Sequence, residues 1–220
     1  MIDHTKEGDI HLVTMTDGPN MICGDWHSRM FEILDLVEAD CGKGAAMVLT
    51  GQEKFFCNGL NLEKLQAQDA DEWKTFGANM AEIHRRLIML PCPTVAAVNG
   101  HAFAGGAFVA LSCDYRIMRE DRGWICISEV DVGVPFGESM MAILRHKLPA
   151  ATARDAVLTG KRYTGPEAVA AGFADGVATE EKLMEEALGL AAMLATKEPG
   201  IFKTLKQNYF APIADGLAAS

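Results

Sequence analysis

Several features that would point directly to a function class are absent from this sequence. Positive charge is in the minority, because 20 Lys and Arg residues face 30 Asp and Glu residues and the net charge is −10. Binding to nucleic acid or to an anionic membrane surface needs clustered Lys and Arg, so the composition argues against both partners. No apolar run approaches membrane-spanning length, and the first residues lack the basic-then-apolar pattern of a secretion signal. We therefore expect an intracellular protein that acts on a small molecule.

Cysteine and histidine patterns typical of metal sites are also missing. The six cysteines include no C-x-x-C pair, and several lie in apolar runs where a free thiol behaves as a small hydrophobic group, which indicates a reducing compartment. The six histidines form no H-E-x-x-H or paired-ligand spacing, so we expect no metal. His101 could contact a ligand, although a lone histidine after a turn is more often structural. The final residues A-A-S differ from the S-K-L peroxisomal signal, which favours a bacterial-type cytoplasmic location over a peroxisomal one.

The centre of the sequence contains a short strand that leads into a glycine pair and an apolar helix. Residues 95–98 are apolar and rich in β-branched side chains, which predicts a buried strand. Asn99-Gly100 ends the strand, and Gly105-Gly106 precedes an apolar segment with helical spacing. Unpaired N–H groups at such a helix start suit an anion, whether a phosphate or an enolate oxygen. The alternative is that the two glycines serve only close packing or a tight turn. Neither G-x-G-x-x-G nor G-x-x-x-x-G-K-[ST] is present, so no nucleotide motif decides between them.

The pattern of elements predicts an α/β protein with a helical tail. A strand at 9–16, a helix at 25–38 and a strand at 45–49 form the strand–helix–strand unit of a parallel sheet. We expect residues 1–150 to form an α/β core and residues 151–220 a helical region of the same domain unit. Within that tail, the apolar and basic segment 201–210 could pack on a partner or cover a ligand. Further strands are expected at 55–57, 95–98, 114–118, 124–127 and 174–177.

A long amphipathic helix before the central stretch begins with a predicted cap at Asp69 and Glu72. We interpret its apolar stripe as a core face rather than a cofactor site. Ligands in α/β folds bind beyond the strand ends, so the loops at 58–61, 104–106 and 128–133 are expected to meet there. The stripe comprises Trp73, Phe76, Met80, Ile83, Leu87 and Leu90.

Four segments together resemble the enoyl-CoA hydratase/isomerase (crotonase) superfamily. Residues 55–62, F-F-C-N-G-L-N-L, are similar to its F-C-A-G-x-D-L, and residues 93–115 follow its K-P-x-I-A-A-V-N-G-x-A-x-G-G-G-x-E-L-A-x-x-C-D. Residues 128–135, S-E-V-D-V-G-V-P, match P-E-x-x-L-G-x-x-P, and residues 158–175 match the later L-T-G…E-A…G-L-V-D segment. The resemblance covers roughly residues 8–180 in unbroken order. It implies a repeated ββα-type spiral core with a C-terminal helical region, assembled as a trimer or a dimer of trimers.

The resemblance also implies a site for an acyl-CoA thioester. In such proteins two backbone N–H groups bind the thioester oxygen as it becomes negative, and the matching positions here are Leu60 and Gly105. Coenzyme A is then part of the substrate, and no further cofactor is needed. The remaining positions that the resemblance assigns to binding substrate and CoA are Cys57, Asn58, Gly59, Gly106, Phe108 and Pro135.

Departures from the family pattern indicate the reaction. Hydratases of the family use two glutamates, and the first of these positions is Phe108 here, which can neither activate water nor donate a proton. The second survives as Glu129, with Asp131 and Glu138 as rival carboxylates. Asp131 would face the same way as Glu129 if the strand before them continued. One base with two oxyanion donors can move a proton from C2 to C4, so the resemblance implies a Δ3,Δ2-enoyl-CoA isomerase of fatty-acid β-oxidation. Asn61 replaces the family's aspartate, so the adenine-side loop is expected to differ in detail.

Two other readings remain open. The chain could catalyse another reaction of this superfamily through a stabilised enolate, namely hydration, decarboxylation or thioester hydrolysis. It could also be an inert CoA-ester-binding or scaffold member, which would bind the ester without turnover.

Overall fold

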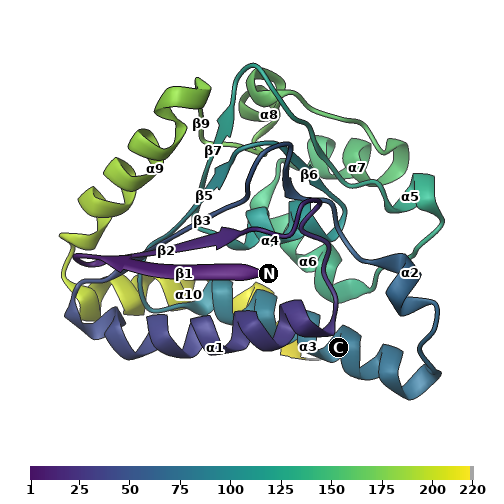
Figure 1. Cartoon of the computed structure of the whole chain (residues 1–220), viewed down its shortest axis with the longest axis horizontal. Coiled ribbons are helices and arrows are strands. Elements are labelled where there is room, and N and C mark those ends of the chain that lie inside the picture. Colours follow the sequence, from purple (N-terminus) through teal and green to yellow (C-terminus); the bar gives the residue numbers. More distant parts are fainter. Residues whose placement is uncertain (219–220) are drawn as a thin grey trace.

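A largely parallel sheet carries most of the strands, and helices cover both of its faces (Figure 1). The computed structural model describes residues 1–218. A six-stranded sheet has the order β1-β2-β3-β5-β7-β9, and a three-stranded sheet has the order β4-β6-β8. The elements are β1 (Ile2–Glu7), β2 (Ile10–Met15), α1 (Gly24–Asp40), the 3-10 helix η1 (Cys41–Lys43), β3 (Ala46–Thr50), β4 (Phe55–Cys57), α2 (Leu62–Leu65), α3 (Ala70–Met89), β5 (Thr94–Val98), β6 (His101–Phe103), α4 (Gly105–Ser112), β7 (Tyr115–Arg119), β8 (Ile125–Cys126), α5 (Glu129–Val132), α6 (Glu138–Lys147), α7 (Ala150–Thr159), α8 (Gly165–Ala171), β9 (Gly176–Ala178), α9 (Glu180–Ala195) and α10 (Pro199–Ala218).

The predicted strand–helix–strand unit is confirmed, but an additional strand precedes it. β2 and β3 pair in parallel with Leu12 opposite Val48, and α1 connects them. β1, which the sequence did not predict, pairs with β2 in antiparallel register. Of its six residues only Ile2 is fully buried, so the apolar alternation on which strand prediction depends is missing from its sequence.

The sheet separates two packed layers because its strands alternate their side chains between the faces. Ala46 and Val48 of β3 pack toward α9, together with apolar residues of β5 and β7. Met47 and Leu49 point the other way, into the larger cluster that includes α1 and α3. The strands are therefore buried on both sides, as is usual for parallel sheets.

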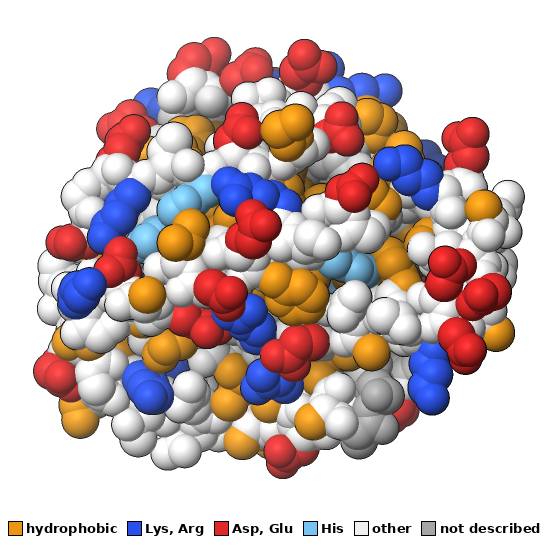
Figure 2. Space-filling view, turned by 60° about the horizontal axis from the view of Figure 1, so that its bottom comes forward, with side chains coloured by type: hydrophobic (Ala, Val, Ile, Leu, Met, Phe, Trp, Pro, Cys, Tyr) orange, Lys and Arg blue, Asp and Glu red, His pale blue; other side chains and the backbone are white. Residues whose placement is uncertain are grey.

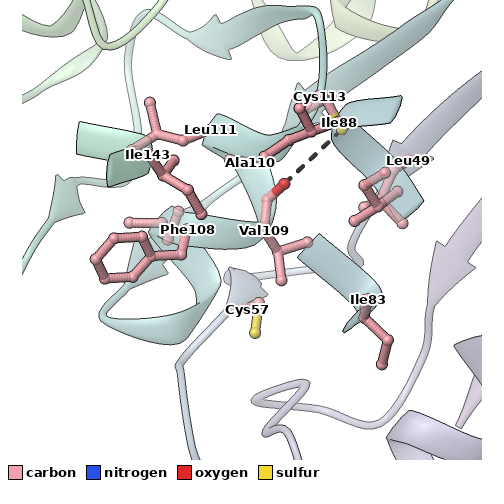
Figure 3. Packing of buried hydrophobic residues seen from close by; sticks show 14 of the residues in the cluster. Leu49, Cys57, Ile83, Ile88, Phe108, Val109, Ala110, Leu111, Cys113 and Ile143 are labelled. Carbon is pink, nitrogen blue, oxygen red and sulfur yellow. Dashed lines mark hydrogen bonds between the residues drawn. The ribbon is translucent and has the colours of Figure 1, made fainter. Parts of the chain in front are cut away.

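Helix α4 runs through the middle of the larger cluster. All eight of its residues are buried, as expected for a helix that is apolar all round. Figure 3 shows Phe108, Val109 and Leu111 leaving it in different directions, toward neighbours from other helices and strands. The Cys113 thiol donates to the carbonyl of Val109 just beyond the helix end (Figure 3). α4 is therefore enclosed by the core along its whole length, including the turn that begins at Gly105.

The last helix packs on the body of the chain. α10 lies against α3 and α6, and Lys206 at its middle is buried. The Lys206 ammonium donates to Asp114 Oδ2 at 2.7 Å and to the carbonyl of Cys92 at 2.9 Å. One of the basic residues of segment 201–210, Lys206, is therefore used in an internal ion pair.

Charges of both signs are distributed over the surface. Figure 2 shows Asp and Glu side chains interspersed with Lys and Arg over one face of the molecule. Within residues 1–218, none of the helices combines the length and the apolar character that crossing a membrane would require.

Candidate active site

A cavity of about 280 Å³ lies where α2 and α3 approach α5 and α6. The start of α4 closes its inner side, and Figure 1 shows α2 and α5 at the same end of the molecule. Its walls are mostly apolar, with a few polar groups, which is typical of sites for small molecules. It is lined by Asn58, Leu60, Leu62, Trp73, Phe76, Gly77, Met80, His84, Ala104, Gly105, Phe108, Ser128, Glu129, Val132, Val134, Pro135, Phe136, Gly137, Ser139 and Met140.

The three loops that were expected to meet do contribute to this cavity. Of the site residues predicted from the sequence, the structure brings together Asn58, Leu60, Gly105, Phe108, Glu129 and Pro135 as lining residues. Cys57, Gly59 and Gly106 do not line it and lie behind its wall. The backbones of Cys57 and Gly106 are in close contact, since a Cβ built on Gly106 would lie 2.1 Å from the carbonyl oxygen of Cys57. A Cβ built on Gly59 would lie 2.9 Å from the carbonyl oxygen of Phe103. These three residues therefore determine how close the lining loops approach each other.

Leu60 and Gly105 both line the cavity, and each carries a backbone N–H group. A Cβ built on Gly59 would lie 3.5 Å from the nitrogen of Gly105, which places the two loops side by side. Within residues 1–218, neither the N–H of Leu60 nor that of Gly105 donates to a backbone carbonyl. Ala104, directly before the helix, has φ 49° and ψ −122°, a conformation that is costly for a residue with a side chain and is found mainly where function demands it. Two N–H groups on neighbouring loops, one of them at the start of α4, can stabilise a developing oxyanion if both face it.

Glu129 supplies an ionisable group to the same cavity. It is the first residue of α5, and its Oε2 is buried without a hydrogen-bond partner among the described residues. Burial raises the pKa of Glu129 to about 7, and its own backbone N–H opposes the shift only in part. A carboxyl group with a pKa near neutrality can both accept and return a proton at physiological pH.

The rival carboxylates point elsewhere. Residues 129–132 form a helix rather than a continued strand. The condition under which Asp131 would face the same way as Glu129 is therefore not met, because residues two apart on a helix diverge. Asp131 packs at the end of α7, where a Cβ built on Gly160 would lie 2.5 Å from its Oδ2. Glu138 is exposed and paired with Arg145. Among the described carboxylates, Glu129 alone lines the cavity.

Phe108 forms an apolar wall beside the glycine pair. Its ring meets Phe136 edge-on at 5.3 Å between centroids and His84 at 6.3 Å. His84 Nδ1 lies 2.8 Å from the Ser112 hydroxyl, which itself donates to the carbonyl of Phe108. Since that hydroxyl has only one proton to donate, His84 is the donor to Ser112, which fixes the imidazole tautomer. Burial lowers the pKa of His84 to about 3, so this ring is neutral and a poor base at neutral pH.

His101 has a structural place. It lies in β6, a strand that was not predicted from the sequence, and stacks on Phe103 with 5.1 Å between ring centroids. Its Nδ1 accepts a hydrogen bond from the backbone N–H of Trp124. His101 is not among the cavity-lining residues, so the alternative that it contacts a ligand receives no support from the geometry.

One wall of the cavity was not predicted. Trp73, Phe76 and Met80 line it, although the sequence analysis interpreted the whole stripe of this helix as core. That interpretation holds for Ile83 and Leu87, which are fully buried in the main cluster. Helical periodicity identifies a face that avoids water, and a cavity wall and a core face share that property.

The chain is similar over most of its length to several known proteins. The model of the family described as enoyl-CoA hydratase/isomerase matches residues 5–220. Enoyl-CoA delta isomerase 2, peroxisomal, from Arabidopsis thaliana is 36% identical, over 88% of this chain and 84% of that protein. Carnitinyl-CoA dehydratase from Salmonella typhi is 33% identical, over 96% and 82%. The crystal structure of an enoyl-CoA hydratase/isomerase family protein from Pseudomonas syringae superimposes with a TM-score of 0.93 at 28% identity, covering 99% of this chain and 94% of that one.

Proposed function

Because the chain belongs to the enoyl-CoA hydratase/isomerase family, we propose that it is a Δ3,Δ2-enoyl-CoA isomerase of fatty-acid β-oxidation. Its substrate is a 3-enoyl-CoA thioester and its product the 2-trans-enoyl-CoA. The family and the fold are those of enzymes that act on acyl-CoA esters, and they include both isomerases and dehydratases. The choice of isomerisation comes from the residues of the cavity.

The observation that carries the proposal is that Glu129 is the single carboxyl group among the described residues that line the cavity. Hydration needs one group to activate water and another to protonate carbon, and the second lining position that hydratases of the family fill with a glutamate is here Phe108. Moving a double bond needs only one base, since the proton that is removed is also the proton returned. The apolar wall formed by Phe108 and Phe136 further excludes water that would compete for the intermediate.

In the proposed mechanism, the N–H groups of Leu60 and Gly105 bind the thioester oxygen. Glu129 takes a proton from C2, and the electron pair of that C–H bond spreads over a dienolate whose negative charge rests on the bound oxygen. Glu129 then gives the proton to C4, the double bond forms between C2 and C3, and the carbonyl is restored. Each preorganised N–H donor of this kind contributes roughly 10²–10³ in rate.

The direct test is incubation with trans-3-hexenoyl-CoA while the conjugated 2-enoyl ester is monitored by absorbance and by product chromatography. We expect conversion to the 2-enoyl ester without build-up of a 3-hydroxyacyl product. Parallel incubations with a 2-enoyl-CoA and with malonyl-CoA test hydration, decarboxylation and thioester hydrolysis. Turnover of those substrates instead of the 3-enoyl ester would refute the proposal, and binding without turnover of any ester would favour the inert reading.

The pKa of Glu129 predicts the pH dependence of the reaction. The base must be ionised, and burial raises its pKa to about 7, so kcat/KM is expected to fall about tenfold per pH unit below 7 and to level off above it. At pH 5 the value would be about one hundredth of the plateau. Steady-state kinetics from pH 5 to 9 measure this profile. If kcat/KM stayed constant down to pH 5, the base would have an ordinary carboxyl pKa or would not be a carboxylate.

A further inference from the structure

Gly77 interrupts the apolar face of α3 where that face lines the cavity. Trp73, Phe76 and Met80 surround it in the sequence and line the same wall. Phe76 and Met80 are buried, whereas Gly77 itself is exposed to solvent. At this position the wall therefore consists of backbone only.

Nothing in the fold requires glycine at this position. Gly77 lies in the interior of a 20-residue helix, and its φ is not in the left-handed region. A Cβ built on it would meet no atom within 4 Å. Glycine is the least favourable residue in a helix interior apart from proline, so a side chain would suit the helix better. The missing side chain leaves space on the cavity side that a bound molecule can occupy.

The position lies toward the open end of the cavity. His84, on the same face of α3, is completely buried beside Phe108 at the inner end. Seven residues of helix separate His84 from Gly77, a distance of roughly 10 Å along the axis. Figure 1 shows the first turns of α3 extending away from the sheets, near α2. A chain that starts at the Gly105 end and runs along α3 would reach Gly77 only if it is long.

We propose that Gly77 determines the length of acyl chain that this site accepts, by leaving open the part of the α3 wall through which the end of a long chain passes. This inference rests on the proposed function, since it takes the ligand to be an acyl-CoA. It assigns the substrate class to medium and long acyl chains rather than short ones alone. A side chain at residue 77 would close the wall and leave the inner part of the cavity unchanged.

The test compares Gly77→Leu with a matched control, Gly189→Leu. Gly189 is also exposed in the interior of a helix, α9, and a Cβ there would likewise meet no atom within 4 Å, but it does not line the cavity. Calorimetry would measure the affinities for hexanoyl-CoA and dodecanoyl-CoA, two saturated esters that cannot isomerise. We expect Gly77→Leu to weaken dodecanoyl-CoA binding at least tenfold and to change hexanoyl-CoA binding less than twofold. Gly189→Leu should change neither, and Gly77→Ala should lie between Gly77→Leu and the wild type.

The inference would be overturned if Gly77→Leu bound dodecanoyl-CoA as tightly as the wild type does. It would also be overturned if the substitution weakened the binding of both esters equally. These outcomes are separable from failure of the proposed function. If the wild type binds both esters but does not convert trans-3-hexenoyl-CoA, the isomerase proposal fails while the chain-length comparison still decides the role of Gly77. If the wild type binds neither ester, both proposals are refuted.

Discussion

Replacement of Glu129 by glutamine is expected to reduce isomerisation of trans-3-hexenoyl-CoA by about 10²–10⁴-fold, the usual contribution of a positioned general base. The amide has nearly the same shape but cannot accept a proton from C2. Binding of hexanoyl-CoA should stay close to the wild-type value, because the oxyanion donors are backbone groups. Steady-state kinetics and calorimetry on the same preparation separate the two effects.

Folding should not be impaired by this change. Burial raises the pKa of Glu129, so the folded protein binds the proton more tightly than the unfolded chain, and the ionised form reduces stability as the pH rises through 7. A neutral amide avoids that cost, and the variant should melt no lower than the wild type at pH 8. The matched control is Glu138→Gln, the same substitution at an exposed carboxylate paired with Arg145, which should retain activity. Substantial turnover by Glu129→Gln would refute the assignment of the base.

Gly106→Ala is expected to damage both the fold and the activity. A Cβ at this position would lie 2.1 Å from the carbonyl oxygen of Cys57 and 2.8 Å from its Cβ. Because the first of these contacts is with backbone, β4 and the start of α4 must move apart. Overpacking of this kind costs about 1–3 kcal/mol, which lowers the melting temperature by several degrees in a chain of this size.

The same movement would separate the N–H of Leu60 from that of Gly105, and loss of one such donor costs about 10²–10³ in rate. Gly105→Ala provides a graded comparison, since its nearest contacts are the flexible side-chain ends of Ile22 at 3.2 Å and Leu60 at 3.4 Å. We expect this variant to be less affected in melting temperature than Gly106→Ala. Wild-type stability and kcat/KM in Gly106→Ala would show that the approach of the two loops does not matter.

The sequence predicted the framework of the fold because its signals there are local. The cap at Asp69 and Glu72 is present as a capping box at the start of α3, and the parallel pairing of β2 with β3 follows from the strand–helix–strand pattern. One short strand was missed. β6 contains only three residues, too few to show a periodic pattern, and it directly follows the turn at Asn99-Gly100.

The site was predicted mainly from the family resemblance, and the structure adds what single positions cannot show. Spacing alone could not separate Glu129 from Asp131, because their orientation depends on whether residues 129–132 are strand or helix. The role of Gly105 depends on its neighbourhood, since a glycine pair before a helix has the same sequence whether it packs or binds. The cavity wall formed by Trp73 and Met80 has the same periodicity as a core face, so only the three-dimensional arrangement distinguishes the two.

The most direct test of the account follows the proton itself. With trans-3-hexenoyl-CoA carrying deuterium at both C2 positions, the proposed mechanism has Glu129 remove a deuteron from C2 and return it to C4 of the same molecule. Because the carboxyl group is half-buried and its Oε2 has no partner, exchange with solvent should be slower than transfer. Mass spectrometry and NMR of the product in ordinary water should therefore find a substantial fraction of deuterium at C4. If the hydrogen added at C4 came from solvent alone, a shuttle by one half-buried base would be contradicted.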